Sequence, residues 1–183
     1  MNFKAVFEYL LSQFTKQRID FALIGGFALH AAGHSRTTQD IDLLICVEDI
    51  EKVKEILSAF GYELIHESQD VLNFQGRLKN LGRIDVIQAH RQYARKMLQR
   101  AKEYDILKSK FSVKVVVPED LIGLKVQASG NDPARYSQDM ADIEIILRNN
   151  RGRLDMKQIR EYFSLFEREA ELDAILERIN HAD

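Results

Sequence analysis

Apolar side chains recur at every third or fourth position in several segments of this 183-residue chain, which is the period of an amphipathic helix. Residues 3–17 and 49–60 show this pattern most fully. The segments expected to be helical are 3–17, 27–32, 49–60, 91–103, 118–130 and 134–149, with two further short helices within 155–180. Pro118 suits a first helical turn, and the two acidic residues after it lie where the helix dipole favours negative charge.

Shorter runs rich in apolar and β-branched residues predict strands between these helices. The segments expected to be strands are 19–24, 40–47, 62–67, 70–75, 83–89 and 111–117. Because the strands are interspersed with helices and no strand is expected after residue 117, we predict an α+β fold, close to the α/β class, with a mixed β-sheet flanked by helices. The expected organisation is a core at 1–117 and a C-terminal helical region at 118–183 that packs on it.

Charge is distributed unevenly along the chain. The formal net charge is −2 with a pI near 6.2, which predicts no general attraction to nucleic acid. Residues 91–114, however, hold eight Lys or Arg against two acidic residues, whereas 155–183 holds eight acidic residues against four basic ones. The first segment, which also contains Tyr93, could meet a polyanion, and two solvated helix faces of opposite sign are the simpler alternative.

Cysteine usage and hydropathy bear on the compartment. The single cysteine, Cys46, excludes an internal disulfide and lies in an apolar run, where a buried and unreactive thiol is expected. No apolar run reaches membrane-spanning length, and the N-terminus lacks the pattern of a signal peptide, so the expectation is a cytoplasmic protein.

The chemistry of the chain is indicated by a glycine pair followed by aspartates. Gly25 and Gly26 follow an apolar strand and precede a short helix, a place where backbone N–H groups can approach a phosphate. Asp40 and Asp42 are two residues apart in a strand and therefore share a face. Asp85 lies in a later apolar strand, from which a third carboxylate could join the other two around Mg²⁺.

This arrangement resembles the nucleotidyltransferase superfamily that includes DNA polymerase beta. The likeness covers roughly residues 5–150, and the segment 36–43 looks like the small bacterial members, among them antibiotic nucleotidyltransferases and the toxin-like enzymes of abortive-infection systems. The resemblance implies a nucleotidyltransferase fold and a magnesium-dependent enzyme. It would transfer a nucleotide from ATP or another nucleoside triphosphate to an acceptor hydroxyl, with release of pyrophosphate.

The resemblance also implies roles for particular residues. Asp40 and Asp42 would bind two Mg²⁺ ions, or Mn²⁺, together with the triphosphate, and Asp85 would bind the ion on the acceptor side and help to deprotonate the hydroxyl. Further nucleotide-binding residues would be Gly25, Gly26, Arg36, Thr38 and Lys125.

Structural explanations compete with each of these roles. A salt bridge to Arg36 or Arg83 could account for one of the aspartates, though less well for all three. An ordinary turn would explain the segment that holds Arg36 and Thr38, and Lys125 could face solvent. In the segment 135–143, Asp139 and Asp142 share a helix face with Arg135, which favours a helix-packing salt bridge over a catalytic role.

The acceptor and the partners stay open at the level of sequence. The acceptor could be RNA, such as a tRNA end, or a small hydroxylated molecule. Competing functions are a non-catalytic, antitoxin-like nucleotide-binding protein of the same fold and an Asp-x-Asp glycosyltransferase. Apolar residues near the C-terminus could pack on the domain, which is the expectation, or on a second subunit; a separate partner protein is also open. These residues are Leu172, Ile175, Leu176 and Ile179.

Overall fold

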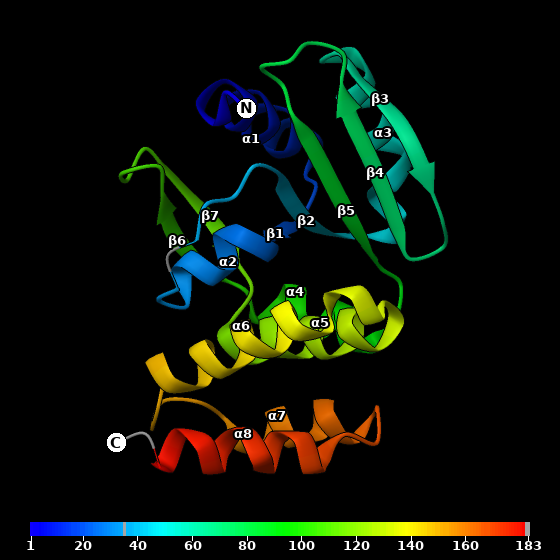
Figure 1. The fold of residues 1–183 in the computed structure, drawn as a ribbon. Coiled ribbons are helices and arrows are strands. Elements are labelled where there is room, and N and C mark those ends of the chain that lie inside the picture. The colour runs from blue at the N-terminus through cyan, green and yellow to red at the C-terminus, as the bar shows by residue number, and fades with distance from the viewer. Residues whose placement is uncertain (35, 182–183) are drawn as a thin grey trace. The chain divides into compact units, whose positions relative to one another are not determined.

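The computed structural model describes residues 1–34 and 36–181, and the chain divides into two compact units (Figure 1). The first unit comprises Met1–Phe27 and Thr37–Val116, and the second comprises Ala28–Arg36 and Val117–Asp183. The helices are α1 (Phe3–Gln17), α2 (Gly25–Ala31), α3 (Ile50–Ala59), α4 (Gln92–Arg100), α5 (Pro118–Asn131), α6 (Tyr136–Asn149), α7 (Met156–Ser164) and α8 (Glu169–His181). The strands are β1 (Phe21–Leu23), β2 (Ile41–Cys46), β3 (Tyr62–Glu67), β4 (Val71–Gly76), β5 (Arg83–Ala89), β6 (Lys102–Ile106) and β7 (Phe111–Val115).

Across the residues that the structure describes, the strands of the first unit form one seven-stranded sheet in the order β3-β4-β5-β2-β1-β7-β6 (Figure 1). Two pairs are parallel, β2 with β5 and β1 with β7, and the other four are antiparallel. The predicted mixed sheet is therefore confirmed. The central strand β2 has fully buried apolar residues on both faces, Ile41 and Leu43 on one face and Leu44 on the other, where Asp42 also lies.

Aromatic side chains join the first helix to the rest of this unit. The Asn2 side chain caps α1, and Arg18 ends it in the left-handed conformation. The ring of Phe14 meets Phe21 of β1 edge to face, with ring centroids 5.0 Å apart. Tyr9 stacks on Phe60 at 3.9 Å beyond the end of α3. These contacts explain why the apolar stripe predicted for residues 3–17 forms the expected helix.

The predicted helix at 91–103 is too long, and a strand was missed. The helix α4 ends at Arg100, and residues from Lys102 form β6, which pairs antiparallel with β7. The last residues of the helical pattern are thus taken up by strand pairing, because an edge position beside β7 supplies the backbone hydrogen bonds that a continued helix would otherwise make.

The second unit is built on contacts of α5 with α6 and α7, and of α8 with α6 and α7. Gly123 of α5 allows one of these approaches, because a Cβ at this position would lie 2.8 Å from the ring of Tyr162 on α7. The side chains of Leu172, Ile175 and Ile179 on α8 are buried. Three of the four apolar residues considered there are thus buried, whereas Leu176 is half-buried.

No helix among residues 1–34 and 36–181 combines the length and the apolar character that crossing a membrane requires.

Candidate active site

Two of the predicted aspartates lie side by side on neighbouring strands. Asp42 on β2 is in register with Asp85 on β5, and Asp85 is in register with Asn73 on β4. The three side chains therefore form a row across one face of the sheet. Asp40 lies one residue before β2, and not within the strand as predicted, but its charge reaches Arg83, the residue that pairs with Asp85. All three aspartates are half-buried, whereas the strand residues that flank Asp42 and Asp85 are fully buried and apolar.

The glycine pair packs directly against this row and the segment that leads into it. Gly25 has φ +56°, and a Cβ there would lie 2.0 Å from Oδ2 of Asp42. A Cβ on Gly26 would lie 2.5 Å from Cβ of Thr38, whose hydroxyl donates to the backbone oxygen of Asp40 at 3.0 Å. The left-handed backbone and the lack of side chains are thus both needed for these close approaches. Among the predicted residues of the first unit, the structure thus places Gly25 against Asp42 and Gly26 against Thr38.

One oxygen of Asp85 carries two strong contacts. Nε of Arg83 donates to Oδ1 of Asp85 at 2.7 Å, and Nδ2 of Asn73 donates to the same oxygen at 2.7 Å. The hydrogen bond to Asp85 is the main cause that raises the pKa of the Arg83 guanidinium, and the charges of Asp40 and Asp42 raise it further. The salt bridge considered from sequence is therefore present for Asp85. Asn73 was missed, and only the register of β4 against β5 identifies it.

The donors of this site fit a divalent ion by their chemistry. Mg²⁺ and Mn²⁺ prefer carboxylate oxygens as ligands. The side chains of Asp40, Asp42 and Asp85 offer only such oxygens. Gly25 leaves open the space next to the Asp42 carboxylate that a Cβ would fill. Within the described part of the chain, no three His, Cys, Asp or Glu side chains stand close enough to hold one ion jointly. Bringing the three carboxylates onto an ion would therefore require side-chain movement.

The other two predicted residues lie in the second unit, in a cluster of buried ion pairs. Nζ of Lys125 donates to Asp139 at 2.8 Å and to Asp142 at 2.6 Å. Nη1 of Arg36 donates to Asp142 at 3.1 Å. The Lys125 side chain is only 8% exposed, so the alternative of a solvent-facing lysine is wrong, whereas the Arg36 side chain is 40% exposed.

The predicted helix-packing salt bridge belongs to this cluster. Nε of Arg135 lies 3.3 Å from Oδ2 of Asp139, one turn away on the same helix face. Nε2 of His34 also lies 3.5 Å from Asp142, so the segment before β2 and the helices α5 and α6 all contribute groups to the cluster. The carboxylates of Asp139 and Asp142 are almost fully buried. These ion pairs therefore offset the free-energy cost of burying two negative charges.

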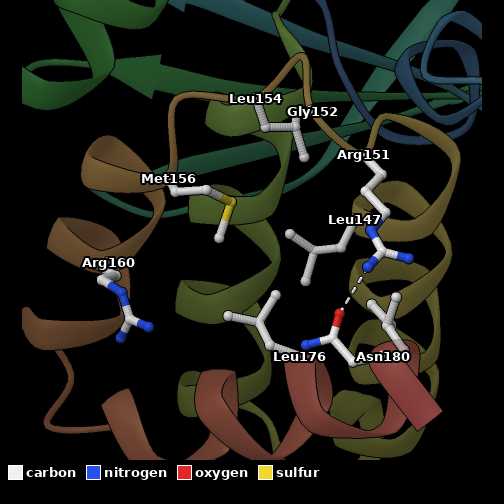
Figure 2. A pocket seen from close by; sticks show the side chains of 9 residues that line it. Leu147, Arg151, Gly152, Leu154, Met156, Arg160, Leu176 and Asn180 are labelled. Carbon is white, nitrogen blue, oxygen red and sulfur yellow. Dashed lines mark hydrogen bonds between the residues drawn. The ribbon is translucent and has the colours of Figure 1, made fainter.

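A cavity of about 360 Å³ lies in the second unit, and none of the predicted site residues lines it (Figure 2). Apolar side chains form most of its wall, among them Leu147, Met156 and Leu176, and the two arginines on it are already engaged. Arg151 donates to Asn180 at 2.9 Å, and Arg160 pairs with Asp173 at 2.8 Å. The cavity therefore offers apolar surface rather than a free cation for an anionic ligand.

A mixed sheet with a glycine pair set against paired strand carboxylates defines the nucleotidyltransferase class of fold. The chain belongs within it to a family described as uncharacterised nucleotidyltransferase, whose model matches residues 2–181. The predicted family resemblance is thus confirmed. No curated protein matches the chain by sequence.

Solved structures agree with this assignment of the fold. The antibiotic-resistance factor ANT(2″)-Ia is similar over all of both chains, with a TM-score of 0.66 and 15% identity. The lincosamide antibiotic adenylyltransferase LnuA, solved with lincomycin, has a TM-score of 0.54 and 17% identity over 75% of this chain and 92% of its own. A putative nucleotidyltransferase from Thermotoga maritima has a TM-score of 0.55 and 8% identity over 76% and 92%. At these identities the likeness confirms the predicted fold.

Proposed function

We propose that this chain is a metal-dependent nucleotidyltransferase that uses a nucleoside triphosphate. The observation that carries the proposal is the register of Asp42 with Asp85, together with the contact of Gly25 against the Asp42 carboxylate. Two carboxylates on adjacent strands next to a helix N-terminus suit a triphosphate and its divalent ions. Family membership supports the transferase class, and nucleotidyltransferases generally use divalent metals.

In this proposal each candidate site residue of the first unit has a defined role. Asp40 and Asp42 would hold the ions that accompany the triphosphate, and the backbone at Gly25 and Gly26 would approach its phosphates. Divalent ions, when bound, would stabilise the attacking and leaving oxygens. The acceptor oxygen would form a bond to the α-phosphorus, the bond from that phosphorus to pyrophosphate would break, and the hydroxyl proton would pass to Asp85.

Arg36, Thr38 and Lys125, which we propose to bind phosphate, differ in their present contacts. Thr38 lies against Gly26, next to the proposed phosphate-binding backbone. Arg36 keeps a large part of its side chain exposed and can present a guanidinium to phosphate while Asp142 holds it. Lys125 is buried between Asp139 and Asp142, and a phosphate contact would have to share its ammonium with both carboxylates.

The proposal is tested by triphosphate binding with and without Mg²⁺, measured for ATP, GTP, CTP and UTP. The wild type is expected to bind at least one of them in a metal-dependent manner, and Asp42→Asn should weaken that binding by about tenfold or more, since it removes a charged ligand. Asp105→Asn on β6 is the matched control, because Asp105 is exposed and lies outside the proposed site. Unchanged metal-dependent binding in Asp42→Asn would remove Asp42 from the site. Binding of nucleotide sugars alone would move the assignment to a glycosyltransferase.

The acceptor is proposed to be a small hydroxylated molecule or RNA. The names of two structural relatives, an antibiotic-resistance factor and a lincosamide adenylyltransferase, favour the small molecule. The basic segment 91–114 favours RNA. A steep loss of acceptor binding with added salt would indicate RNA, whereas binding that is insensitive to salt would indicate a small molecule.

A further inference from the structure

Asn73 holds Asp85 from the side that faces away from Asp42. In the sheet, β5 lies between β4 and β2, so Asn73 and Asp42 flank Asp85 on opposite sides. Asn73 and Arg83 both donate to Oδ1 of Asp85, each at 2.7 Å. The two donors therefore draw one carboxylate oxygen toward β4 and toward the start of β5. This agrees with the finding that no three acidic or metal-ligating side chains are gathered together among the described residues.

Arg83 supplies a positive charge to this acidic site. Its guanidinium is bonded to Asp85 and also lies within the field of Asp40 and Asp42. Asp42 and Asp85 lie in register on neighbouring strands, and neighbouring carboxylates repel each other unless a cation is near. Arg83, which is always protonated, reduces this repulsion without any bound ion.

We propose that Arg83 is the resident cation of the acidic site: it pairs with Asp85 in the absence of metal, competes with divalent ions, and releases the carboxylate when an ion enters. In this arrangement Arg83 is a positioning residue, because it acts through Asp85. Asn73 holds the same oxygen without charge and guides the carboxylate back. This role of Arg83 rests on the proposed function and deepens it. If Arg83 competes with the divalent ion, the ion binds strongly only when the triphosphate is also bound.

Titration with Mn²⁺ in the absence of nucleotide, followed by calorimetry or by the electron paramagnetic resonance of the free ion, tests this proposal. Arg83→Gln removes the competing charge and should bind Mn²⁺ about tenfold more tightly than the wild type, or tighter still. Arg83→Lys keeps a cation at the site and should stay within about threefold of the wild type. Arg95→Gln is the matched control: Arg95 is also ion-paired, but with Glu48, and should leave the affinity unchanged.

Two outcomes would overturn the proposal. Mn²⁺ affinity in Arg83→Gln equal to or below that of the wild type would mean that Arg83 supports the site instead of competing for it. An equal gain in Arg95→Gln would show only the effect of net charge. Joint binding of Mn²⁺ and ATP by the wild type tests the proposed function separately. If the wild type does not bind the two together, the proposed function itself fails; if it does, only the role of Arg83 is in question.

A second measurement uses the wild-type chain and does not depend on how a variant folds. The Nε–H of Arg83 donates to Asp85 and should therefore give a protected resonance in a ¹H–¹⁵N spectrum, identified by its absence in Arg83→Lys. Addition of Mg²⁺ is expected to shift or broaden this resonance with the same midpoint as ion binding. A resonance that stays unchanged while the ion binds would contradict the release of Asp85.

Discussion

At the scale of the single residue, the position of Gly25 requires both a left-handed backbone and the absence of a side chain. Its backbone is left-handed, which costs an L-residue about 1–2 kcal/mol, and a Cβ would overlap the Asp42 carboxylate. Gly25→Ala is therefore expected to displace Asp42 and to reduce metal-dependent triphosphate binding about tenfold or more, since the proposed ligand no longer holds its place. Calorimetric titration with ATP and Mg²⁺ measures this effect.

Gly152 provides the control for that substitution. Its φ is +73°, yet a Cβ there would meet nothing within 4 Å. Gly152→Ala should thus show the backbone strain alone, about 1–2 kcal/mol in urea unfolding, with triphosphate binding unchanged. If both variants bound triphosphate like the wild type, the close packing of Gly25 on Asp42 would have no part in nucleotide binding.

Cys46 permits a prediction about pH. Burial raises the pKa of its thiol, Arg95 partly offsets the rise, and the carboxylate of Glu48 adds to it. Because the thiolate is the reactive form, alkylation by iodoacetamide should be slow at pH 8 and should still be accelerating above the ordinary pKa of 9.0. Arg95→Gln removes the opposing charge and should slow the reaction at pH 8 further. A rate that levels off below pH 8 would contradict this prediction.

At the scale of the element, the sequence pattern identifies most of the helices and strands, because the spacing of apolar residues along the sequence matches the spacing of buried residues in the structure. Helix 3–17 and strands 62–67 and 83–89 were predicted with the bounds that the structure shows. The strand β6 was missed, since its residues alternate poorly and are stabilised by pairing with distant β7. Local pattern does not reveal such non-local pairing.

The same limit applies to the proposed site. Spacing within one strand predicted that Asp40 and Asp42 share a side, although β2 begins only at Ile41. The apolar run around Asp85 marked a second strand, which is β5. The register between strands is not contained in either run. Sequence could therefore name Arg83 as a partner two residues from Asp85, but it could not find Asn73, which lies twelve residues away on β4.

The packing of α7 on α5 supplies a prediction for the elements of the second unit. The hydroxyl of Tyr162 donates to the fully buried carboxylate of Asp120 at 2.7 Å. Tyr162→Phe leaves that carboxylate with one donor fewer and should lower the free energy of unfolding by about 1.5–3 kcal/mol. Urea denaturation measures the change, with Tyr104→Phe on β6 as the control. A loss no larger than in the control would mean that the hydroxyl does not matter for the packing of α7 on α5.

At the scale of the whole molecule, one ionic cluster unites stretches of sequence that are far apart. Lys125 is bound by Asp139 and Asp142, and the second of these also binds Arg36. Lys125→Met should lower the free energy of unfolding by about 3–5 kcal/mol, because two buried carboxylates lose their shared cation. Lys157→Met, at an exposed position of α7, is the control for urea denaturation.

A further variant separates charge from packing in this cluster. The triple change Lys125→Met, Asp139→Asn and Asp142→Asn removes the uncompensated charges and should recover part of the lost stability. If the triple variant were less stable than Lys125→Met alone, the ion pairs of Asp142 with Arg36 and of Asp139 with Arg135 would be enough to stabilise the two carboxylates without the lysine.

The segment Ala28–Arg36 has a consequence for how this architecture can be inherited. It lies within the sequence of the first unit, but its backbone oxygens at Ala32 and Gly33 accept from Asn150 and Asn149 of the second, each at 2.9 Å. A unit assembled from two separate stretches of gene cannot be gained, lost or exchanged by one recombination event near residue 117. Such an event would leave nine residues behind with their partners removed. The two units should therefore descend together, and a shuffled descendant that carries only one of them should be rare.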